Sequence, residues 1–263
     1  MSAIVIKGGL IHYEAFGRGK PLVFVHGWLG SWRYWMPAME ELSDRYRTYA
    51  LDLWGFGDSD KSQDRYTVAE YVELVASFME EMGIGKAALV GHALGGAVAV
   101  RFAVLYPERV DRLMAVCLPL SGEAISLRTL TADSNLLFGG LFGYPREYQP
   151  VQQEMKKTAE NAILHSAQSV MELDLLADLE SLKVPLLIVY GQKDRIVDPN
   201  QARLLSINAT VRSMYMAEAK HFPMLEERSK FNRLLRDFLE LDFSKNGALG
   251  SLEFKDEWRR RVR

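Results

Sequence analysis

The sequence predicts an α/β fold in which a mostly parallel sheet carries helices on both faces. Short apolar runs alternate with longer helical patterns along most of the chain, and such alternation is typical of parallel strands joined by crossover helices. One junction is especially clear. A buried-type strand at residues 87–90 passes through a glycine-rich turn into an apolar helix that ends before Pro107.

The composition is that of an ordinary globular chain of 263 residues, 48% hydrophobic and 25% charged, with a formal net charge of -2. This length suffices for one sizeable core and an inserted lid. The near-neutral charge indicates neither nucleic acid nor an anionic membrane surface as a partner. No run approaches the ~20 apolar residues of a membrane span. The first residues lack a signal-peptide pattern, so we expect a cytoplasmic protein.

Seven strands are expected from their short apolar runs, at residues 11–15, 22–25, 48–51, 87–90, 113–118, 186–190 and 213–216. A helix at residues 67–82 opens with the capping box Thr67-Val68-Ala69-Glu70 and ends at Gly83. A last helix is expected at residues 226–239. The single cysteine, Cys117, lies in one of the apolar runs. It excludes an internal disulfide, and we expect a buried, inert thiol.

The alternation stops between residues 120 and 183, where helical patterns such as residues 166–182 replace strands. We therefore expect residues 1–119 and 184–263 to form the core domain and residues 120–183 to form a helical lid. Large apolar residues alternate with glycines inside this segment. Four of them are candidates for lining a substrate pocket, although they could equally pack the lid onto the core: Leu137, Phe138, Leu141 and Phe142.

Residues 91–95, Gly-His-Ala-Leu-Gly, have the frame G-x-S-x-G of a nucleophile elbow, with Ala93 where the attacking serine would stand. In such a turn the central residue is strained, and the glycines let neighbouring backbone approach closely. The simpler interpretation is a tight turn that packs a helix on a strand. The rest of the chain decides between the two.

A second loop, His26-Gly27-Trp28, follows the strand at residues 22–25. Its glycine leaves backbone N–H groups free to point above the sheet, and a developing oxyanion needs two such donors. We predict the N–H groups of Trp28 and Leu94 as this pair, with His26 as a structural support of the loop. The turn-rich segment at residues 52–59 is expected to be a shaped loop bordering the pocket.

An acid and a base follow later strands. Asp194 lies in the loop after the strand at residues 186–190, where active sites of open parallel sheets gather. Asp198 is a rival, but it directly precedes Pro199 and is typical of a helix N-cap. Of the five histidines, only His221 occupies a loop after a strand without a structural reason to be there, so it is the candidate base.

With these motifs in this order, the chain resembles an α/β-hydrolase of the small lidded esterase type. The resemblance covers residues 11–239 and implies an α/β-hydrolase fold with a lid insertion. It implies Asp194 as the orienting acid, His221 as the general base, and Trp28 and Leu94 as the oxyanion hole. Ala93 departs from the family pattern, because a methyl group has no lone pair with which to attack a carbonyl.

Three explanations of Ala93 remain open. The chain is an inactive form of a serine esterase for small to medium apolar or aromatic esters, a natural non-hydrolytic ligand-binding protein or lyase, or an inactivated aspartate-nucleophile dehalogenase or epoxide hydrolase. We favour the first, because every other catalytic part is present; a carbon-carbon bond hydrolase would share the same parts. No metal site or cofactor is expected, since no histidine pair has ligand spacing and no glycine-rich phosphate loop is present. The expected partner is a small-molecule ester substrate.

Overall fold

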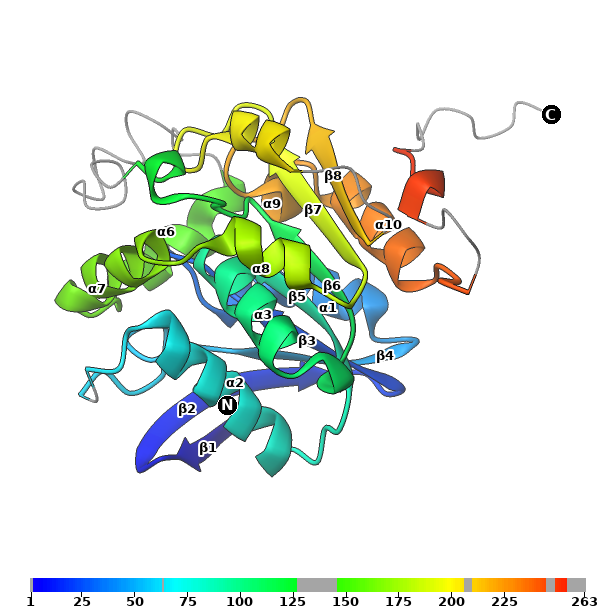
Figure 1. Ribbon diagram of the computed structural model, residues 1–263. Helices are drawn as coiled ribbons and strands as arrows, with labels where there is room; N and C mark the ends of the chain where they lie inside the picture. Colours follow the sequence, from blue (N-terminus) through cyan, green and yellow to red (C-terminus); the bar gives the residue numbers. More distant parts are fainter. Residues whose placement is uncertain (1, 63, 127–145, 206–209, 245–248, 255–263) are drawn as a thin grey trace.

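The computed structural model describes residues 2–62, 64–126, 146–205, 210–244 and 249–254 (Figure 1). Its centre is an eight-stranded sheet with the order β1-β2-β4-β3-β5-β6-β7-β8. Strand β2 is antiparallel to both neighbours, and the remaining pairs are parallel. The strands are β1 (Ser2–Ile6), β2 (Gly9–Phe16), β3 (Lys20–Val25), β4 (Tyr46–Leu51), β5 (Ala87–His92), β6 (Val110–Val116), β7 (Leu186–Gly191) and β8 (Val211–Met216). The expected mostly parallel sheet is confirmed.

Several strand boundaries differ from the expected ones, and one strand was not expected. Strand β1 was not expected; it forms the edge of the sheet and buries only Ile6 fully, so it lacks an apolar run. The expected strand at residues 113–118 begins earlier, at Val110, and ends at Val116. Cys117 already has a φ of +49°. The apolar run continues past the strand because the following loop is buried too.

Helices cover both faces of the sheet, as expected (Figure 1). Helices α2 (Val68–Glu81), α3 (Leu94–Leu105) and α8 (Leu175–Ser181) pack together on one face, while α1 (Met36–Leu42) and α10 (Arg228–Leu239) pack together on the other. The predicted capping box at the start of α2 is present. Among the described helices, none is both long and apolar enough to cross a membrane.

The segment at residues 120–183, called the inserted segment below, connects β6 to β7. Its described elements are η3 (Gly122–Ala124), η5 (Arg146–Tyr148), α6 (Gln149–Met155), α7 (Glu160–Met171) and α8. The single helix expected at residues 166–182 is wrong. The chain breaks between α7 and α8 because Asp174 caps α8, accepting a hydrogen bond from the N–H of Ala177 at 3.0 Å. The four candidate pocket residues, Leu137, Phe138, Leu141 and Phe142, lie outside the described residues.

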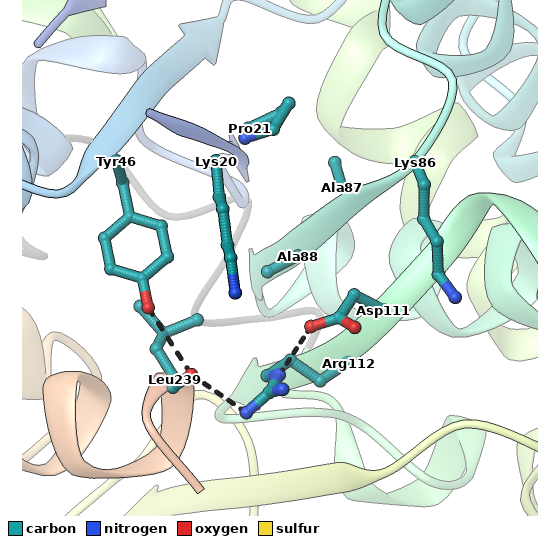
Figure 2. A pocket seen from close by; sticks show the side chains of 9 residues that line it. All are labelled: Lys20, Pro21, Tyr46, Lys86, Ala87, Ala88, Asp111, Arg112 and Leu239. Carbon is teal, nitrogen blue, oxygen red and sulfur yellow. Dashed lines mark hydrogen bonds and ion pairs between the residues drawn. The ribbon is translucent and has the colours of Figure 1, made fainter. Parts of the chain in front are cut away.

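A cavity of about 190 Å³ lies at the amino ends of β3, β5 and β6 (Figure 2). Arg112 on its wall donates hydrogen bonds to the carbonyls of Phe238, Leu239 and Leu241 at 2.9–3.0 Å. The carbonyls of Phe238 and Leu239 belong to the last turn of α10, whose last C=O groups have no partner inside the helix, and Leu241 lies just beyond it. Arg112 therefore fixes α10 to the sheet at the amino ends of the strands, opposite to the candidate site.

Candidate active site

The elbow after β5 holds Ala93 in a strained conformation, with φ +46° and ψ -108°. Its N–H donates to the carbonyl of Val116 on the neighbouring strand at 2.8 Å. Gly91 and Gly95 are required for space. A Cβ at Gly91 would lie 2.2 Å from the carbonyl oxygen of Gly95, and a Cβ at Gly95 would lie 2.3 Å from that of Val25. The close packing of β5, α3 and β3 thus imposes the turn.

The loops after β7 and β8 bring Asp194 and His221 together. The Nδ1–H of His221 donates to Oδ2 of Asp194 at 2.8 Å, and both side chains are fully buried. The other carboxylate oxygen of Asp194 accepts the N–H groups of Ile196 at 2.8 Å and Val197 at 3.2 Å. With Nδ1 protonated, Nε2 of His221 is an acceptor, and it has no hydrogen-bond partner in the described chain. It is therefore available to a hydroxyl group.

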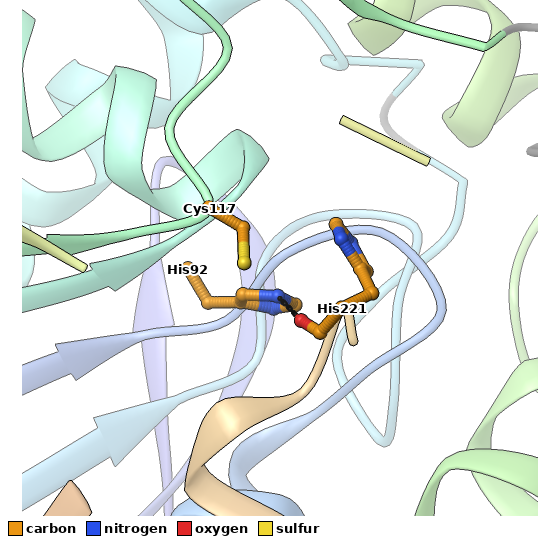
Figure 3. Close-up of side chains that lie close together, drawn as sticks. All are labelled: His92, Cys117 and His221. Atoms are coloured by element: carbon orange, nitrogen blue, oxygen red, sulfur yellow. Dashed lines mark hydrogen bonds between the residues drawn. The ribbon is translucent and has the colours of Figure 1, made fainter. Parts of the chain in front are cut away.

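His92, directly before Ala93, links three loops of the site, and Figure 3 shows its contact with the His221 loop. The N–H of Gly27 donates to the hydroxyl of Tyr34 at 2.6 Å, and this hydroxyl donates to Nδ1 of His92 at 3.0 Å. The Nε2–H of His92 then donates to the carbonyl of His221 at 2.8 Å. Burial lowers the pKa of His92 well below its usual value, so a neutral ring with fixed proton positions connects the elbow to the His221 loop. The sequence around His92 does not indicate this role, because its partners Tyr34 and His221 are far away along the chain.

The loop after β3 carries Trp28 and begins with His26. His26 accepts the N–H of Leu53 through Nε2 at 2.9 Å, and its Nδ1–H donates to the carbonyl of Gly27 at 2.9 Å. Burial lowers the pKa of this histidine, which fits the structural role expected for it. Leu29 has a φ of +66°, so the backbone turns sharply after Trp28. In the described chain, no hydrogen-bond acceptor is assigned to the N–H of Trp28 or of Leu94.

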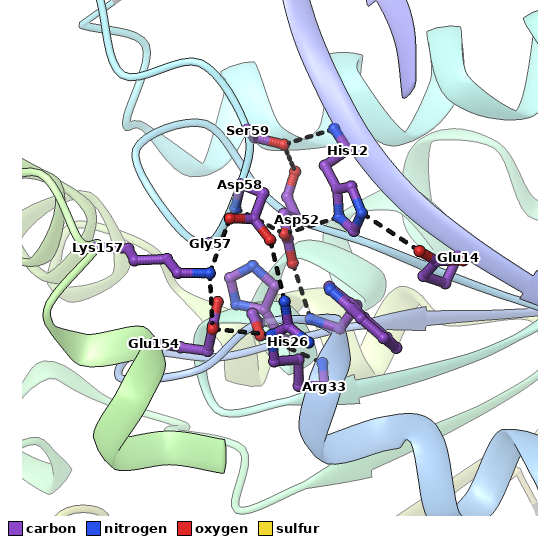
Figure 4. Close-up of polar contacts among 12 residues, drawn as sticks. His12, Glu14, His26, Arg33, Asp52, Gly57, Asp58, Ser59, Glu154 and Lys157 are labelled. Atoms are coloured by element: carbon purple, nitrogen blue, oxygen red, sulfur yellow. Dashed lines mark hydrogen bonds and ion pairs between the residues drawn. The ribbon is translucent and has the colours of Figure 1, made fainter. Parts of the chain in front are cut away.

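The loop after β4 is organised by the buried Asp52 (Figure 4). Its carboxylate accepts the N–H of Trp32 at 2.8 Å and that of Asp58 at 2.9 Å, and it binds Nδ1 of His12 at 3.1 Å. Burial lowers the pKa of His12, but the hydrogen bond and the charge of Asp52 outweigh it and leave this pKa raised. Asp52 thus shapes the loop that was expected to border the pocket.

Two side-chain groups in the described ranges bring possible metal ligands within 4.8 Å of one another. His92, Cys117 and His221 form the first (Figure 3). Both nitrogens of His92 already make hydrogen bonds, and burial raises the pKa of the Cys117 thiol well above its usual value. A metal ion would have to break the hydrogen bonds of His92 and deprotonate the Cys117 thiol. In the second group, Asp52 already accepts two backbone N–H groups. Neither group is arranged for an ion.

The structure therefore brings five predicted residues to the carboxyl ends of the parallel strands: Trp28, Ala93, Leu94, Asp194 and His221. The rival Asp198 lies at a helix N-cap, where it accepts the N–H of Asn200 at 2.9 Å. Cys117 is fully buried, as expected. A buried histidine held by a carboxylate, with one ring nitrogen unpartnered, can accept a proton from a nucleophile.

Comparison with known proteins agrees with this architecture. A family model described as the alpha/beta hydrolase fold matches residues 20–143. A dihydrolipoyllysine-residue acetyltransferase component of an acetoin cleaving system, from Pseudomonas putida, is 31% identical over 253 residues, which cover 89% of this chain and 68% of that protein. The chain belongs to the α/β-hydrolase fold family.

Other similar proteins include an esterase and, by fold, a lactonase. A pimeloyl-acyl-carrier-protein methyl ester esterase from Aeromonas hydrophila is 28% identical over 255 residues, covering 87% of this chain and 99% of that enzyme. The crystal structure of an enol-lactonase from Burkholderia xenovorans superposes with a TM-score of 0.78 at 20% identity, covering 90% of this chain and 99% of the other. The last comparison shows a shared fold.

Proposed function

We propose that this chain carries the active site of a serine hydrolase of carboxylic esters, with Ala93 in the place of the nucleophile. The observation that carries the proposal is Nε2 of His221, which is buried and has no hydrogen-bond partner among the described residues, while Asp194 holds Nδ1. The ring of His221 lies 4.6 Å from that of His92, the residue before the strained elbow position. This arrangement prepares a base for a hydroxyl at position 93.

With serine at position 93, His221 would take the hydroxyl proton as the oxygen attacks the ester carbonyl. The N–H groups of Trp28 and Leu94 would bind the resulting oxyanion, and Asp194 would stabilise the imidazolium. His221 would then protonate the leaving alcohol as the ester C–O bond breaks. Water, activated by the same ring, would release the acid and restore the hydroxyl.

The substrate class follows from the relatives and from the inserted segment. The similar proteins named above include a methyl ester esterase and an enol-lactonase, so the ester bond is the favoured target. We assign the inserted segment as a lid. Its apolar residues Leu137, Phe138, Leu141 and Phe142 would favour a small to medium ester with an apolar acyl or aromatic part.

Ala93 itself predicts binding without turnover. Loss of the serine of such a triad lowers turnover by ~10⁶, about 8 kcal/mol of activation free energy. Ground-state binding changes far less, because the lost hydroxyl acts mainly in the transition state. The chain as it stands should therefore hold an uncleaved ester.

The deciding experiment is the substitution Ala93→Ser. We expect it to produce hydrolysis of simple aryl esters and labelling by a serine-directed phosphonate, measured by release of the phenol and by intact mass. The double variant Ala93→Ser with His221→Gln is the matched control. It retains the hydroxyl but loses the base, and it should return to background.

Three outcomes decide among the explanations. Hydrolysis in the serine variant alone supports the proposal. A folded serine variant that stays inert toward a broad ester and thioester panel contradicts it and leaves ligand binding or lyase chemistry as the function. Dehalogenation or epoxide opening by an Ala93→Asp variant would instead assign the chain to the aspartate-nucleophile enzymes.

A further inference from the structure

Glu226, the last residue of α9 (Pro223–Glu226), turns its carboxylate back onto the loop that carries His221. One carboxylate oxygen accepts the backbone N–H of Lys220, the residue before His221. The other accepts the hydroxyl of Tyr148, which lies at the end of η5 in the inserted segment. A single side chain thus joins the His221 loop to the inserted segment.

Tyr148 also touches the residue after His221. Its ring lies 5.7 Å from the ring of Phe222 in an edge-on arrangement, and Phe222 lies 5.1 Å from the ring of His221, also edge-on. Tyr148 and Phe222 are both buried. The backbone on both sides of His221 is consequently packed against the Tyr148–Glu226 pair.

The three anchors of His221 act on different atoms. Asp194 binds the ring through Nδ1, and His92 donates to the backbone carbonyl of His221. Glu226 binds the backbone one residue before His221, through the N–H of Lys220. Displacement of a general base by 1 Å can cost about 100-fold in rate, so an anchor on the backbone matters to a base that must meet its partner closely.

The surroundings of Glu226 make its charge sensitive to pH. Burial raises the pKa of Glu226 to about 7, opposed by the N–H groups of Lys220 and Phe222 and assisted by the charges of Glu147 and Glu227. Cys117 lies close enough for the charge of Glu226 to raise its pKa as well. The carboxylate that accepts both donors is therefore partly protonated at neutral pH.

We propose that Glu226 is a positioning residue, which fixes His221 through the Lys220 peptide and couples it to the inserted segment through Tyr148. This inference rests on the proposed function, in which His221 is the general base. Through its hydrogen bond with Tyr148, Glu226 would make the position of His221 depend on the contact between the inserted segment and the core. Ionised Glu226 is the competent state, because only then can both carboxylate oxygens accept at full strength.

The first test uses the chain with Ala93 and needs no turnover. The proton on Nδ1 of His221, shared with Asp194, is followed by NMR in the unsubstituted chain and in Glu226→Gln and Tyr148→Phe variants. Glutamine keeps the size of the side chain, but its single oxygen can accept from only one of the Lys220 N–H and the Tyr148 hydroxyl, so the charge-assisted contact to the other is lost. We expect the resonance to broaden and shift in both variants, and to remain unchanged in Glu218→Gln, which removes an exposed carboxylate from the same loop.

The second test places the same substitutions on the Ala93→Ser background. We expect Glu226→Gln to lower kcat about 10- to 100-fold with little change in KM, since it misplaces the base without touching substrate. The contribution of Glu226 to the acid limb of the pH profile near pH 7 should disappear in that variant. Glu226→Asp should restore part of the activity, and Glu218→Gln should retain all of it.

The outcomes separate the two proposals. If the serine variant is inert but the NMR signal responds to Glu226→Gln, the proposed hydrolysis fails and the positioning role stands. If folded Glu226→Gln leaves the Nδ1 proton resonance unchanged, the positioning role is overturned whatever the activity. A loss of thermal stability without any change in that resonance, kcat or pH profile would likewise reduce Glu226 to a structural residue and overturn it.

Discussion

At the scale of single residues, the elbow keeps its shape because of its neighbours. A non-glycine residue at positive φ costs on the order of 1 kcal/mol or more, and Ala93 adopts this conformation with φ +46°. The packing of Gly91 against Gly95, and of Gly95 against β3, holds the turn whatever side chain stands between them. A serine introduced at position 93 therefore meets a conformation that already exists.

The assignment of the acid gives a prediction at this scale. On the Ala93→Ser background, Asp194→Asn should lower kcat by about 10⁴-fold, because an amide leaves the His221 ring in the wrong tautomer. Asp198→Asn should leave kcat unchanged and cost at most about 1 kcal/mol of folding free energy, as expected for a cap whose replacement also caps well. Steady-state kinetics and urea unfolding of both variants check this. Equal losses of kcat would mean that the acid is misassigned.

Ala93, Asp194 and His221 could be singled out from sequence because each lies in a turn or loop that follows a strand. The sequence pattern alone therefore predicts where in the fold these three residues lie. His92 and Glu226 could not be assigned in the same way. Their partners are Tyr34 and Tyr148, which are 58 and 78 residues away along the chain, and only the folded chain brings them together.

At the scale of elements, α6 is joined to the core by an ion network (Figure 4). Oε1 of the buried Glu154 accepts from Nε of Arg33 and from Nζ of Lys157, both at 2.9 Å. Lys157 also binds Asp58 at 2.8 Å. Because Glu154 is nearly inaccessible to solvent while both cations are about one-third exposed, this contact is stronger than a fully exposed pair.

We predict that Glu154→Ala lowers the free energy of unfolding by about 2 kcal/mol, since it removes two charge-assisted hydrogen bonds. Glu240→Ala, which breaks the exposed pair with Arg45, is the comparison variant and should cost less than about 1 kcal/mol. Urea denaturation at low and high salt measures both. An equal cost for the two substitutions would show that the network does not hold α6.

The helix boundaries in the inserted segment show where periodicity is not enough. Residues 166–182 have a continuous helical pattern, yet the chain forms α7 and α8 with a turn between them. Asp174 is compatible with a helix interior by sequence but caps a new helix in the structure. The free energies of continuing a helix through Asp174 and of capping a new helix there differ little, so tertiary packing decides between the two. By contrast, the capping box of α2 preceded a long periodic run and was predictable.

At the scale of the whole molecule, the carboxyl ends and the amino ends of the parallel strands carry different groups. The carboxyl ends of the parallel strands carry the buried site residues, as the topology rule for open parallel sheets predicts. The amino ends carry Arg112, which closes the end of α10. The order of the strands was not predicted, but their mostly parallel arrangement followed from the alternation of elements. The antiparallel edge strand β1 did not, because an exposed edge strand buries too few apolar residues to leave a pattern.

The stability of the whole molecule should depend on pH through Glu226, a partly buried acid. The pKa of Glu226 is raised from 4.5 to about 7, so folding favours the protonated form. Its stabilising contribution is complete below pH 4.5 and is lost as pH rises through about 7, a change of at most about 3 kcal/mol. His12, whose pKa is raised above 6.5, changes in the same direction. His26 and His92, whose pKa values burial lowers, act in the opposite direction below pH 6.5, so the contribution of Glu226 is the part of the pH dependence that its own substitution removes.

Urea unfolding of the chain at pH 5 and pH 8 measures this dependence, and the substitution Glu226→Gln isolates the contribution of one group. Glutamine does not titrate, so the difference between the two pH values should shrink by roughly the amount assigned to Glu226. Glu218→Gln removes an exposed acid and should leave the difference nearly unchanged. The quantity to compare is the difference in the free energy of unfolding between the two pH values, because Glu226→Gln also weakens the contact with Lys220 at both of them. A difference that survives the substitution intact would mean that Glu226 is ionised throughout this range, and that its burial does not govern its charge.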